Sequence, residues 1–486
     1  MGKKSQLKLA LPKGRLLSKT ASLLDRADWR LDGYHQKARL YHLDSQRFPN
    51  LSAKVFHEKD IPIQVAVGNY DLGICGLDWV EELLAKYPSS ALVKLRNLGY
   101  GEGALYVIAS RAGAIPSVEA MLARGDIIRL ASEYPNLAEF FALSLRLRRF
   151  SVFPLWGAAE AYPPENADLA LISGRMGEKV FNHDLVPVAN VLNFSACLIA
   201  NKISCESKDL SKILSSIDSI LPGMEEPPSP AVMVDALEIA ERYPSQFPEK
   251  LEISQGAAEG TVRLALPDGH QQLPTLQLLS KSGIQIDDYP SGAGNRRPTT
   301  SLGGVEIKVI RPQDMPLQVA NGNFDLAITG KDWLMEHLHQ FPSSPVTELL
   351  DLKFGKVRIV AVVSKELPVE DVAGLKQLYA EQTVPVRVAS EYVNIADKCA
   401  RDNRLGAYKV IPTWGASEAF LPEDADLLIE NTETGRTIAR HNLKIIDTLF
   451  ESTARLIGNK DSITSSSRGE RIRSITETLG AAVEDT

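Results

Sequence analysis

Short apolar runs alternate with amphipathic stretches along the first part of the chain. The apolar runs predict strands at residues 7–11, 71–74, 104–109 and 127–131. Stretches with apolar positions three and four residues apart predict helices at residues 18–25, 78–86 and 137–146. Strands that alternate with helices form mostly parallel sheets covered by helices on both faces. The pattern therefore predicts an α/β protein that binds ligands at the carboxyl ends of its strands.

The same motifs occur twice and in the same order. The run LKLALPKGR at residues 7–15 returns as VRLALPDGH at residues 262–270. The run DIPIQVAVGNYDLGICGLDW, starting at Asp60, returns as DMPLQVANGNFDLAITGKDW, starting at Asp314. Farther along, PLWGAAEAYPPENADLAL is matched by PTWGASEAFLPEDADLLI. The spacing between matching positions changes by only a few residues over this long period, so the chain is predicted to be a duplicated domain.

A proline-containing segment separates the two repeats. Pro227, Pro228 and Pro230 break helices and stiffen a spacer, and residues 231–242 predict one linker helix. The predicted domains are a first copy at residues 1–222, a linker at 223–260 and a second copy at 261–486.

Composition places the chain among globular proteins and narrows the choice of partners. Hydrophobic residues make up 44% of the 486 positions, and the net charge is −7. This sign argues against nucleic acid or an anionic membrane as the main partner. No apolar run approaches the roughly 18 residues that span a bilayer, and the N-terminal run is too short for a signal peptide. The four cysteines show no disulfide framework, so we expect a cytoplasmic protein.

The most specific chemical motif is DLLIENTETGRT at residues 426–437. An apolar strand leads here into acidic residues and then into a tight turn of the form Thr-Gly-x-Thr. Backbone N–H groups of such a turn, with the hydroxyls of Thr434 and Thr437, can surround a 5-phosphate. The carboxylates of Glu430 and Glu433 can accept hydrogen bonds from vicinal ribose hydroxyls. Taken alone, the motif fits a polar turn with a helix cap equally well.

The motifs together resemble the short-form ATP phosphoribosyltransferases. That family has an opening ALPKGRL strand, a D-I-P-x-x-V segment, D-L-G-I-x-G-x-D, Y-x-N, G-S-x-E and an acidic T-G-x-T loop, and the resemblance covers both copies. It implies two-lobed units like type II periplasmic binding proteins, with the active site in the cleft. It also implies a reaction of histidine biosynthesis in which N1 of ATP attacks C1 of phosphoribosyl pyrophosphate (PRPP) and expels pyrophosphate. Mg²⁺ would be held mainly through the substrate phosphates.

The two copies depart from the family in opposite ways. The first copy keeps the basic opening motif at residues 13–15, which in the family faces the nucleotide and its phosphates. Its loop is ISGRMGEK, with Met176 and Lys179 in place of both threonines, so PRPP binding there is predicted to be lost. The second copy keeps the loop but opens with Asp268-Gly269-His270. We expect Asp268 to repel a polyphosphate.

The resemblance assigns candidate roles in both copies. The predicted PRPP-binding residues are Glu430, Asn431, Thr432, Glu433, Thr434, Gly435, Arg436 and Thr437. The predicted catalytic residues are Lys13, Arg15 and Arg39. The other cleft candidates are Glu418, Arg311, Tyr392 and Asn394. We expect Asp60, Asp78, Asp314 and Asp332 to cap helices or hold turns, and Trp156 and Trp414 to be packing residues.

Arg39 matches an arginine that reaches the neighbour's active site in dimers of the family. Its counterpart in the second copy is Arg296 or Arg297. This predicts a covalent pseudo-dimer, in which Arg39 completes a working site in the second-copy cleft. An exposed charge at the end of a helix explains Arg39 equally well.

Three functions fit these observations. The first is an ATP phosphoribosyltransferase with ATP and PRPP as substrates and one active copy. The second is a catalytically inactive regulatory paralogue of a phosphoribosyltransferase, and the third is a cytosolic protein that binds small anions. The intact loop at residues 430–437 favours the first, because a non-catalytic protein does not need both carboxylates and both threonines. A further homo-oligomer or a separate regulatory subunit is compatible with each function.

Overall fold

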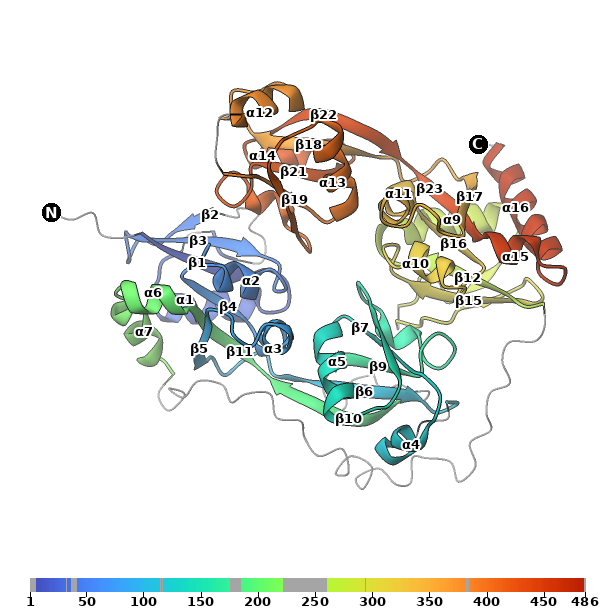
Figure 1. The fold of residues 1–486 in the computed structure, drawn as a ribbon, viewed down its shortest axis with the longest axis horizontal. Coiled ribbons are helices and arrows are strands. Elements are labelled where there is room, and N and C mark those ends of the chain that lie inside the picture. Colours follow the sequence, from blue (N-terminus) through green and yellow to red (C-terminus); the bar gives the residue numbers. More distant parts are fainter. Residues whose placement is uncertain are drawn as a thin grey trace. The chain divides into compact units, whose positions relative to one another are not determined.

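The chain forms two compact units. The computed structural model describes residues 6–31, 33–35, 42–113, 115, 117–174, 185–221, 260–292, 294–380 and 384–484. Unit 1 consists of Met1–Pro154, Ala167–Glu252 and Thr413–Phe420, and unit 2 of Leu155–Asn166, Ile253–Pro412 and Leu421–Thr486. In the described residues, each unit has two main sheets with helices packed on them, and unit 2 also has a two-stranded sheet of β13 Ile286–Asp287 and β14 Thr299–Thr300 (Figure 1).

The first lobe of unit 1 is built on a sheet with the strand order β2-β3-β1-β4-β11-β5. The strands are β1 Leu7–Pro12, β2 His42–Asp44, β3 Leu51–Phe56, β4 Leu72–Gly76, β5 Leu92–Asn97 and β11 Ala196–Asn201. The helices are α1 Leu17–Arg26, α2 Ile61–Ala66, α3 Leu77–Lys86, α6 Lys202–Ser207 and α7 Ser211–Asp218. Strand β1 runs parallel to β3 and β4, whereas β11 runs antiparallel to β4 and β5.

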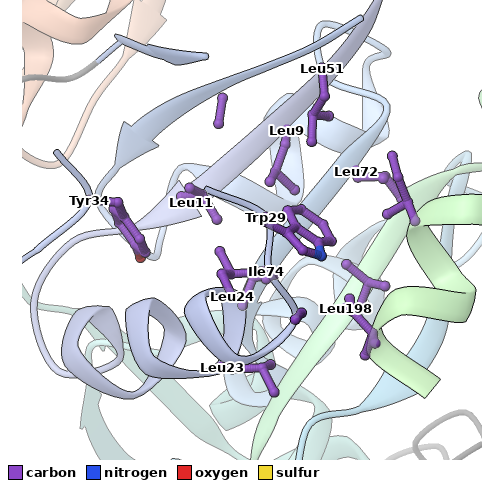
Figure 2. Packing of buried hydrophobic residues seen from close by; sticks show 14 of the residues in the cluster. Leu9, Leu11, Leu23, Leu24, Trp29, Tyr34, Leu51, Leu72, Ile74 and Leu198 are labelled. Atoms are coloured by element: carbon purple, nitrogen blue, oxygen red, sulfur yellow. The ribbon is translucent and has the colours of Figure 1, made fainter. Parts of the chain in front are cut away.

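Alternating leucines in β1 explain how this lobe packs. Leu7, Leu9 and Leu11 point to one face of the sheet, because side chains alternate along a strand. They join buried residues of α1 and α7 in one cluster, part of which Figure 2 shows. Trp29 is fully buried in the cluster, and its indole N–H donates to Ser216 Oγ at 2.8 Å. Helix α2 covers the opposite face.

The second lobe of unit 1 has the strand order β10-β6-β9-β7-β8. Its strands are β6 Gly103–Ser110, β7 Ile128–Ser132, β8 Phe150–Pro154, β9 Leu169–Gly174 and β10 Leu185–Phe194, and its helices are α4 Val118–Ala123 and α5 Pro135–Ser144. The chain crosses between the lobes after β5 and again at Ser195, between β10 and β11.

Unit 2 repeats this plan with the orders β15-β12-β16-β23-β17 and β20-β19-β21-β18-β22. Its strands are β12 Val262–Pro267, β13 Ile286–Asp287, β14 Thr299–Thr300, β15 Val305–Ile310, β16 Leu326–Gly330, β17 Val346–Asp351, β18 Val357–Ser364, β19 Val386–Ser390, β20 Tyr408–Pro412, β21 Leu427–Thr432, β22 Leu443–Ser452 and β23 Ala454–Asn459. Its helices are η3 Gly269–Gln271, α9 Gln272–Lys281, α10 Met315–Ala320, α11 Lys331–Gln340, α12 Val372–Tyr379, α13 Val393–Asp402, α14 Arg436–Arg440, α15 Lys460–Thr464 and α16 Gly469–Glu484. The register is also repeated, since β12 pairs with β15 and β16 as β1 pairs with β3 and β4.

The predicted α/β class with two-lobed tandem units is confirmed. Each main sheet contains three successive parallel strands and continues through antiparallel strands, so the sheets are mixed. Strands β11 and β23, which follow a crossing between lobes, run antiparallel to β4 and β16. The predicted boundaries at residues 222 and 261 stay predictions, and the predicted helix at 231–242 lies outside the described residues.

Two short segments pack in the unit that holds most of the other copy. Residues Leu155–Asn166 of the first copy, including η1 Ala159–Ala161, belong to unit 2. Residues Thr413–Phe420 of the second copy, with η4 Ser417–Phe420, belong to unit 1. There the fully buried Phe420 packs edge-on against Phe56, with ring centroids 5.3 Å apart. The compact units therefore do not coincide with the sequence repeats.

Polar contacts fix Leu155–Asn166 in unit 2. The backbone N–H of Trp156 donates to both carboxylate oxygens of Asp314, at 3.1 and 3.2 Å. The indole ring of Trp156 packs on Trp333. Lys308 Nζ donates to Glu165 Oε2 and Asn166 Oδ1, both at 2.6 Å. Burial lowers the pKa of Lys308 to about 8, partly offset by the charge of Glu165.

Within the described part of the chain, no helix is both long enough and apolar enough to cross a membrane.

Candidate functional site

The predicted PRPP loop of the second copy follows the middle strand of its sheet. Strand β21 ends at Thr432, and the turn that follows leads into α14. Thr432 Oγ1 accepts a hydrogen bond from the Gly435 N–H at 2.9 Å, and Thr434 Oγ1 accepts from the Arg436 N–H at 3.4 Å. Gly435 has φ of +73°, a left-handed conformation that favours glycine. The Thr-Gly pair thus folds the chain sharply at the end of the strand.

The loop presents a mixture of hydroxyl, carboxylate and guanidinium groups to solvent. The exposed residues are Asn431, Glu433, Thr434, Arg436 and Thr437. Glu430 and Gly435 are half-buried, whereas Thr432 is buried. Hydroxyl groups on a tight turn can donate to a phosphate, and carboxylates can accept from ribose hydroxyls. The PRPP-binding role of the loop stays a prediction.

A buried chain of hydrogen bonds anchors the start of the loop. Asn431 Nδ2 donates to Tyr392 Oη at 3.0 Å, and Tyr392 Oη donates to Asp332 Oδ2 at 2.7 Å. Ser452 Oγ donates to the other carboxylate oxygen of Asp332, also at 2.7 Å. Sequence reasoning selected Asn431 and Tyr392 but missed the role of Asp332 and Ser452.

Asp332 and Asp78 do not cap helices as expected. Helices α11 and α3 have Gly330 and Gly76 at their N-caps, and neither aspartate caps its helix. The carboxylates instead accept the phenol protons of Tyr392 and Tyr134 across the lobes, because those hydroxyls lie within reach and need a partner when buried.

The predicted cleft residue Asn394 is bound to a carboxylate of the neighbouring lobe. Its backbone N–H and Nδ2 both donate to Glu336 Oε1, at 2.8 and 2.7 Å, and the N–H of Ile395 donates to Oε2. Glu336 thereby caps α13 from α11. Burial raises the pKa of Glu336, opposed by these hydrogen bonds.

The charge of Asp268 is paired in the structure, and its expected repulsion of a polyphosphate stays a prediction. Arg296 Nη1 donates to Asp268 Oδ2 at 2.9 Å, and Arg311 Nη1 donates to Oδ1 at 3.1 Å. Two guanidinium groups therefore surround one carboxylate, and Arg311 remains more than one third exposed. The opening of the second copy is not a net negative surface.

Both arginines predicted to match Arg39 bind the first-copy segment in unit 2. Arg296 Nε donates to Glu160 Oε1 at 3.0 Å, and Arg297 Nη2 donates to Glu165 Oε2 at 3.1 Å. Arg297 also donates to backbone carbonyl groups of that segment. Arg39 itself lies outside the described residues, and its role stays a prediction.

In the first copy, the predicted catalytic Arg15 is already bound by two carboxylates. Its Nε donates to Glu58 Oε2 at 2.9 Å, and its Nη2 donates to both oxygens of Asp78 at 2.8 and 2.7 Å. The guanidinium group lies over the Phe194 ring, 5.0 Å from the centroid. Burial raises the pKa of Glu58 to about 7, against the opposing charge of Arg15. Lys13, which precedes Arg15 by two positions in the sequence, is exposed.

A cavity of about 320 Å³ opens next to Arg15. Its lining includes Lys19, Glu102, Ser173 and Phe194. Ser173 stands at the position of Asn431 in the repeat, and Met176 and Lys179 lie outside the described residues.

The structure places the predicted residues in two groups. Lys13, Arg15 and Glu418, which is half-buried in η4, belong to unit 1. The loop, Arg311, Tyr392 and Asn394 belong to unit 2, where Tyr392 and Asn431 are in direct contact. In the described ranges, no group of three or more His, Cys, Asp or Glu side chains is arranged to hold a metal ion.

The fold and the loop define a two-lobed α/β protein with repeated units and a tight, hydroxyl-rich turn at a strand end. The family model described as ATP phosphoribosyltransferase matches residues 57–221 and 311–481, which together make up more than half of the chain. The chain therefore belongs to the ATP phosphoribosyltransferase family.

Individual relatives align with about half of the chain. The ATP phosphoribosyltransferase of Chlorobaculum parvum is 32% identical over 231 residues, covering 46% of this chain and 73% of the relative. That of Prosthecochloris aestuarii is 32% identical over 232 residues, covering 47% and 73%. Among solved structures, the ATP phosphoribosyl transferase (HisG:HisZ) complex from Thermotoga maritima is 22% identical with a TM-score of 0.38, covering 46% of this chain and 100% of the matched chain.

Proposed function

We propose that this protein transfers the phosphoribosyl group of PRPP to N1 of ATP and releases pyrophosphate, at one site in the second copy. The observation that carries the proposal is the loop at residues 430–437, which keeps both carboxylates and both turn threonines. Its first part is fixed by the buried pair of Asn431 and Tyr392. Relatives 32% identical to one half of the chain have the name of this activity.

Different residues of the loop bind the phosphate and the ribose of the substrate. The hydroxyls of Thr434 and Thr437 are exposed and donate to the 5-phosphate, together with N–H groups of the turn. The carboxylates of Glu430 and Glu433 accept hydrogen bonds from the ribose hydroxyls. These carboxylates also stabilise the positive charge that develops on the ribose ring as the bond to pyrophosphate breaks.

Cations are needed where charge gathers on the departing pyrophosphate. In the first copy, His57 lies among Lys13, Arg15 and Lys59, whose charges help burial to lower its pKa. The corresponding positions of His57 and Lys13 in the second copy are Arg311 and Asp268, which form an ion pair. We assign to the partly exposed Arg311 the cationic role that Lys13 has in the opening motif. The catalytic roles of Lys13, Arg15 and Arg39 stay predictions.

The donor set of the loop suits a magnesium ion that arrives with the substrate. Mg²⁺ in phosphoryl sites is usually bound by one or two carboxylates together with substrate phosphates and water. Glu430 and Glu433 offer two carboxylates on one turn, so these residues would hold it. When bound, the ion supplies positive charge that neutralises the pyrophosphate.

Activity measurements decide between the proposed function and its alternative. Purified protein is incubated with ATP, PRPP and Mg²⁺, and phosphoribosyl-ATP is followed by mass spectrometry. We expect product with ATP, and a large loss of product in the Glu430→Gln/Glu433→Gln variant. PRPP binding without any product would reject the enzyme and favour a catalytically inactive regulatory paralogue, a function for which the occupied Arg15 of the first copy is the supporting observation. A cytoplasmic location and a further oligomer or regulatory subunit remain parts of the proposal.

A further inference from the structure

We propose that Asp332 is a positioning residue of the second copy, which orients the Asn431 amide through Tyr392 and so couples the PRPP loop to the crossing between lobes at Ser452. The ligand named in this inference rests on the proposed function. The coupling itself rests on the hydrogen bonds and can be measured without activity.

The proton of each hydroxyl determines the direction of the chain of hydrogen bonds. Tyr392 is fully buried, and burial raises its pKa well above the usual value, so the phenol keeps its proton. That proton is donated to Asp332, which leaves the phenol oxygen to accept from Asn431 Nδ2. The Asn431 amide therefore has one orientation, with its carbonyl oxygen turned away from the phenol.

The position of Asp332 depends on a glycine at the strand end. A Cβ at Gly330 would lie 2.0 Å from Asp332 Oδ1, so a side chain there would displace the carboxylate. Without one, the carboxylate folds back over the end of β16, at the start of α11. The positive end of the α11 dipole and two hydroxyl donors together stabilise this buried charge.

Asp332 contacts both the loop and the crossing. Tyr392 and Asn431 come from one lobe, and Asp332 comes from the other lobe. Ser452 ends β22, immediately before the chain enters β23 of the other lobe, and its Oγ accepts from the Asp332 N–H at 3.0 Å. The N–H of Lys331 donates to the Thr453 carbonyl at 3.0 Å. A change of angle between the lobes therefore moves Asp332. Because Asp332 binds Tyr392, and Tyr392 binds Asn431, the movement reaches the loop.

The first copy retains only part of this arrangement. Tyr134 Oη donates to Asp78 Oδ2 at 2.9 Å, as Tyr392 donates to Asp332. The positions of Asn431 and Ser452 are occupied by Ser173 and Phe194, and Arg15 takes both carboxylate oxygens of Asp78. The complete link from crossing to loop is thus present where the PRPP loop is intact.

The test removes one oxygen from the link in the full-length protein. In Tyr392→Phe, we expect amide hydrogen exchange of residues 430–440 to accelerate about tenfold, and the KM for PRPP to rise about tenfold with a much smaller change in kcat. The matched control is Tyr408→Phe, which removes a phenol–carboxylate bond to Asp397 of 2.7 Å in the same lobe. This control should change neither quantity. Asp332→Asn keeps an acceptor for the phenol. Its hydrogen exchange at residues 430–440 and its KM for PRPP should therefore be closer to the wild-type values than those of Asp332→Ala.

Unchanged exchange at residues 430–440 in Tyr392→Phe would overturn the inference, whether or not the enzyme turns over. If this variant does not fold, Asn431→Ala, at an exposed position, replaces it with the same expected rise in KM and in exchange. A wild-type protein that makes no product refutes the proposed function alone, because the exchange measurement still tests the coupling.

Discussion

At the scale of single residues, the two threonines of the loop carry the clearest expectation. Thr434 and Thr437 are exposed on a turn whose other polar atoms are partly engaged within the loop. Replacing both by Ala removes two phosphate donors, each worth about 1–3 kcal/mol to a charged ligand. We expect PRPP affinity measured by calorimetry to fall at least about tenfold, with the melting temperature nearly unchanged. Equal affinity in wild type and variant would contradict the phosphate role.

His57 gives a pH dependence of stability in unit 1. Burial, helped by the positive charges of Lys59, Lys13 and Arg15, lowers the pKa of His57 from 6.5 to about 4. The unfolded chain therefore binds a proton on this ring between pH 6.5 and 4 that the folded protein does not bind. Stability is expected to fall as pH decreases through this window, by up to about 3 kcal/mol from this residue.

Denaturant titrations at several pH values check the His57 prediction. His57→Gln should flatten the loss of stability between pH 6.5 and 4. His42→Gln, at an exposed position of β2, controls for the loss of one histidine and should keep the slope. The same slope in His57→Gln as in wild type would show that the acid sensitivity arises elsewhere.

Local sequence predicted some site residues and not others, for a physical reason. The loop is recognisable because its acidic residues, threonines and glycine are neighbours in the chain. Ser452 lies 120 residues from its partner Asp332, and no local pattern marks it. The ion pairs of Asp268 with Arg296 and Arg311 could not be predicted for the same reason. These three residues lie far apart in the sequence, and only the fold brings their charges together.

At the scale of elements, Gly435 determines how β21 passes into α14. Its φ of +73° costs an alanine about 1–2 kcal/mol, whereas a Cβ would meet Ile445 only at 3.5 Å. Gly435→Ala should therefore lower stability slightly and reduce PRPP affinity by reshaping the turn. Gly406, with the same φ and open space around it, is the matched control. Gly406→Ala should lose comparable stability and keep PRPP affinity, and a loss of affinity in both variants would argue against a local effect.

The apolar pattern predicted element positions well and strand directions only in part. Predicted strands and helices such as residues 7–11 and 78–86 overlap β1 and α3 closely, because alternation and helical spacing are local properties. The direction of β11 and β23 depends on the chain having crossed to the other lobe and back. A buried strand has the same composition in either direction, so this could not be predicted from the pattern.

At the scale of the whole molecule, the repeat predicts an unequal pair of sites. Described first-copy positions Ile172 and Ser173 replace Glu430 and Asn431 of the second copy. We therefore expect each chain to bind one PRPP. Calorimetric titration with Mg²⁺ present should give a stoichiometry near one, and two equivalent sites per chain would contradict the assignment of the second copy as the working half.

The exchange of Leu155–Asn166 and Thr413–Phe420 has a consequence for how such a gene can change. Neither repeat contains everything that its own compact unit uses. Lys308 of the second repeat is bound by Glu165 and Asn166 of the first, and Phe56 of the first repeat packs on Phe420 of the second. A recombination event that separated the halves would leave a buried ammonium group without its partners. The duplication is in this sense hard to reverse, and the halves are inherited together even as their loops diverge.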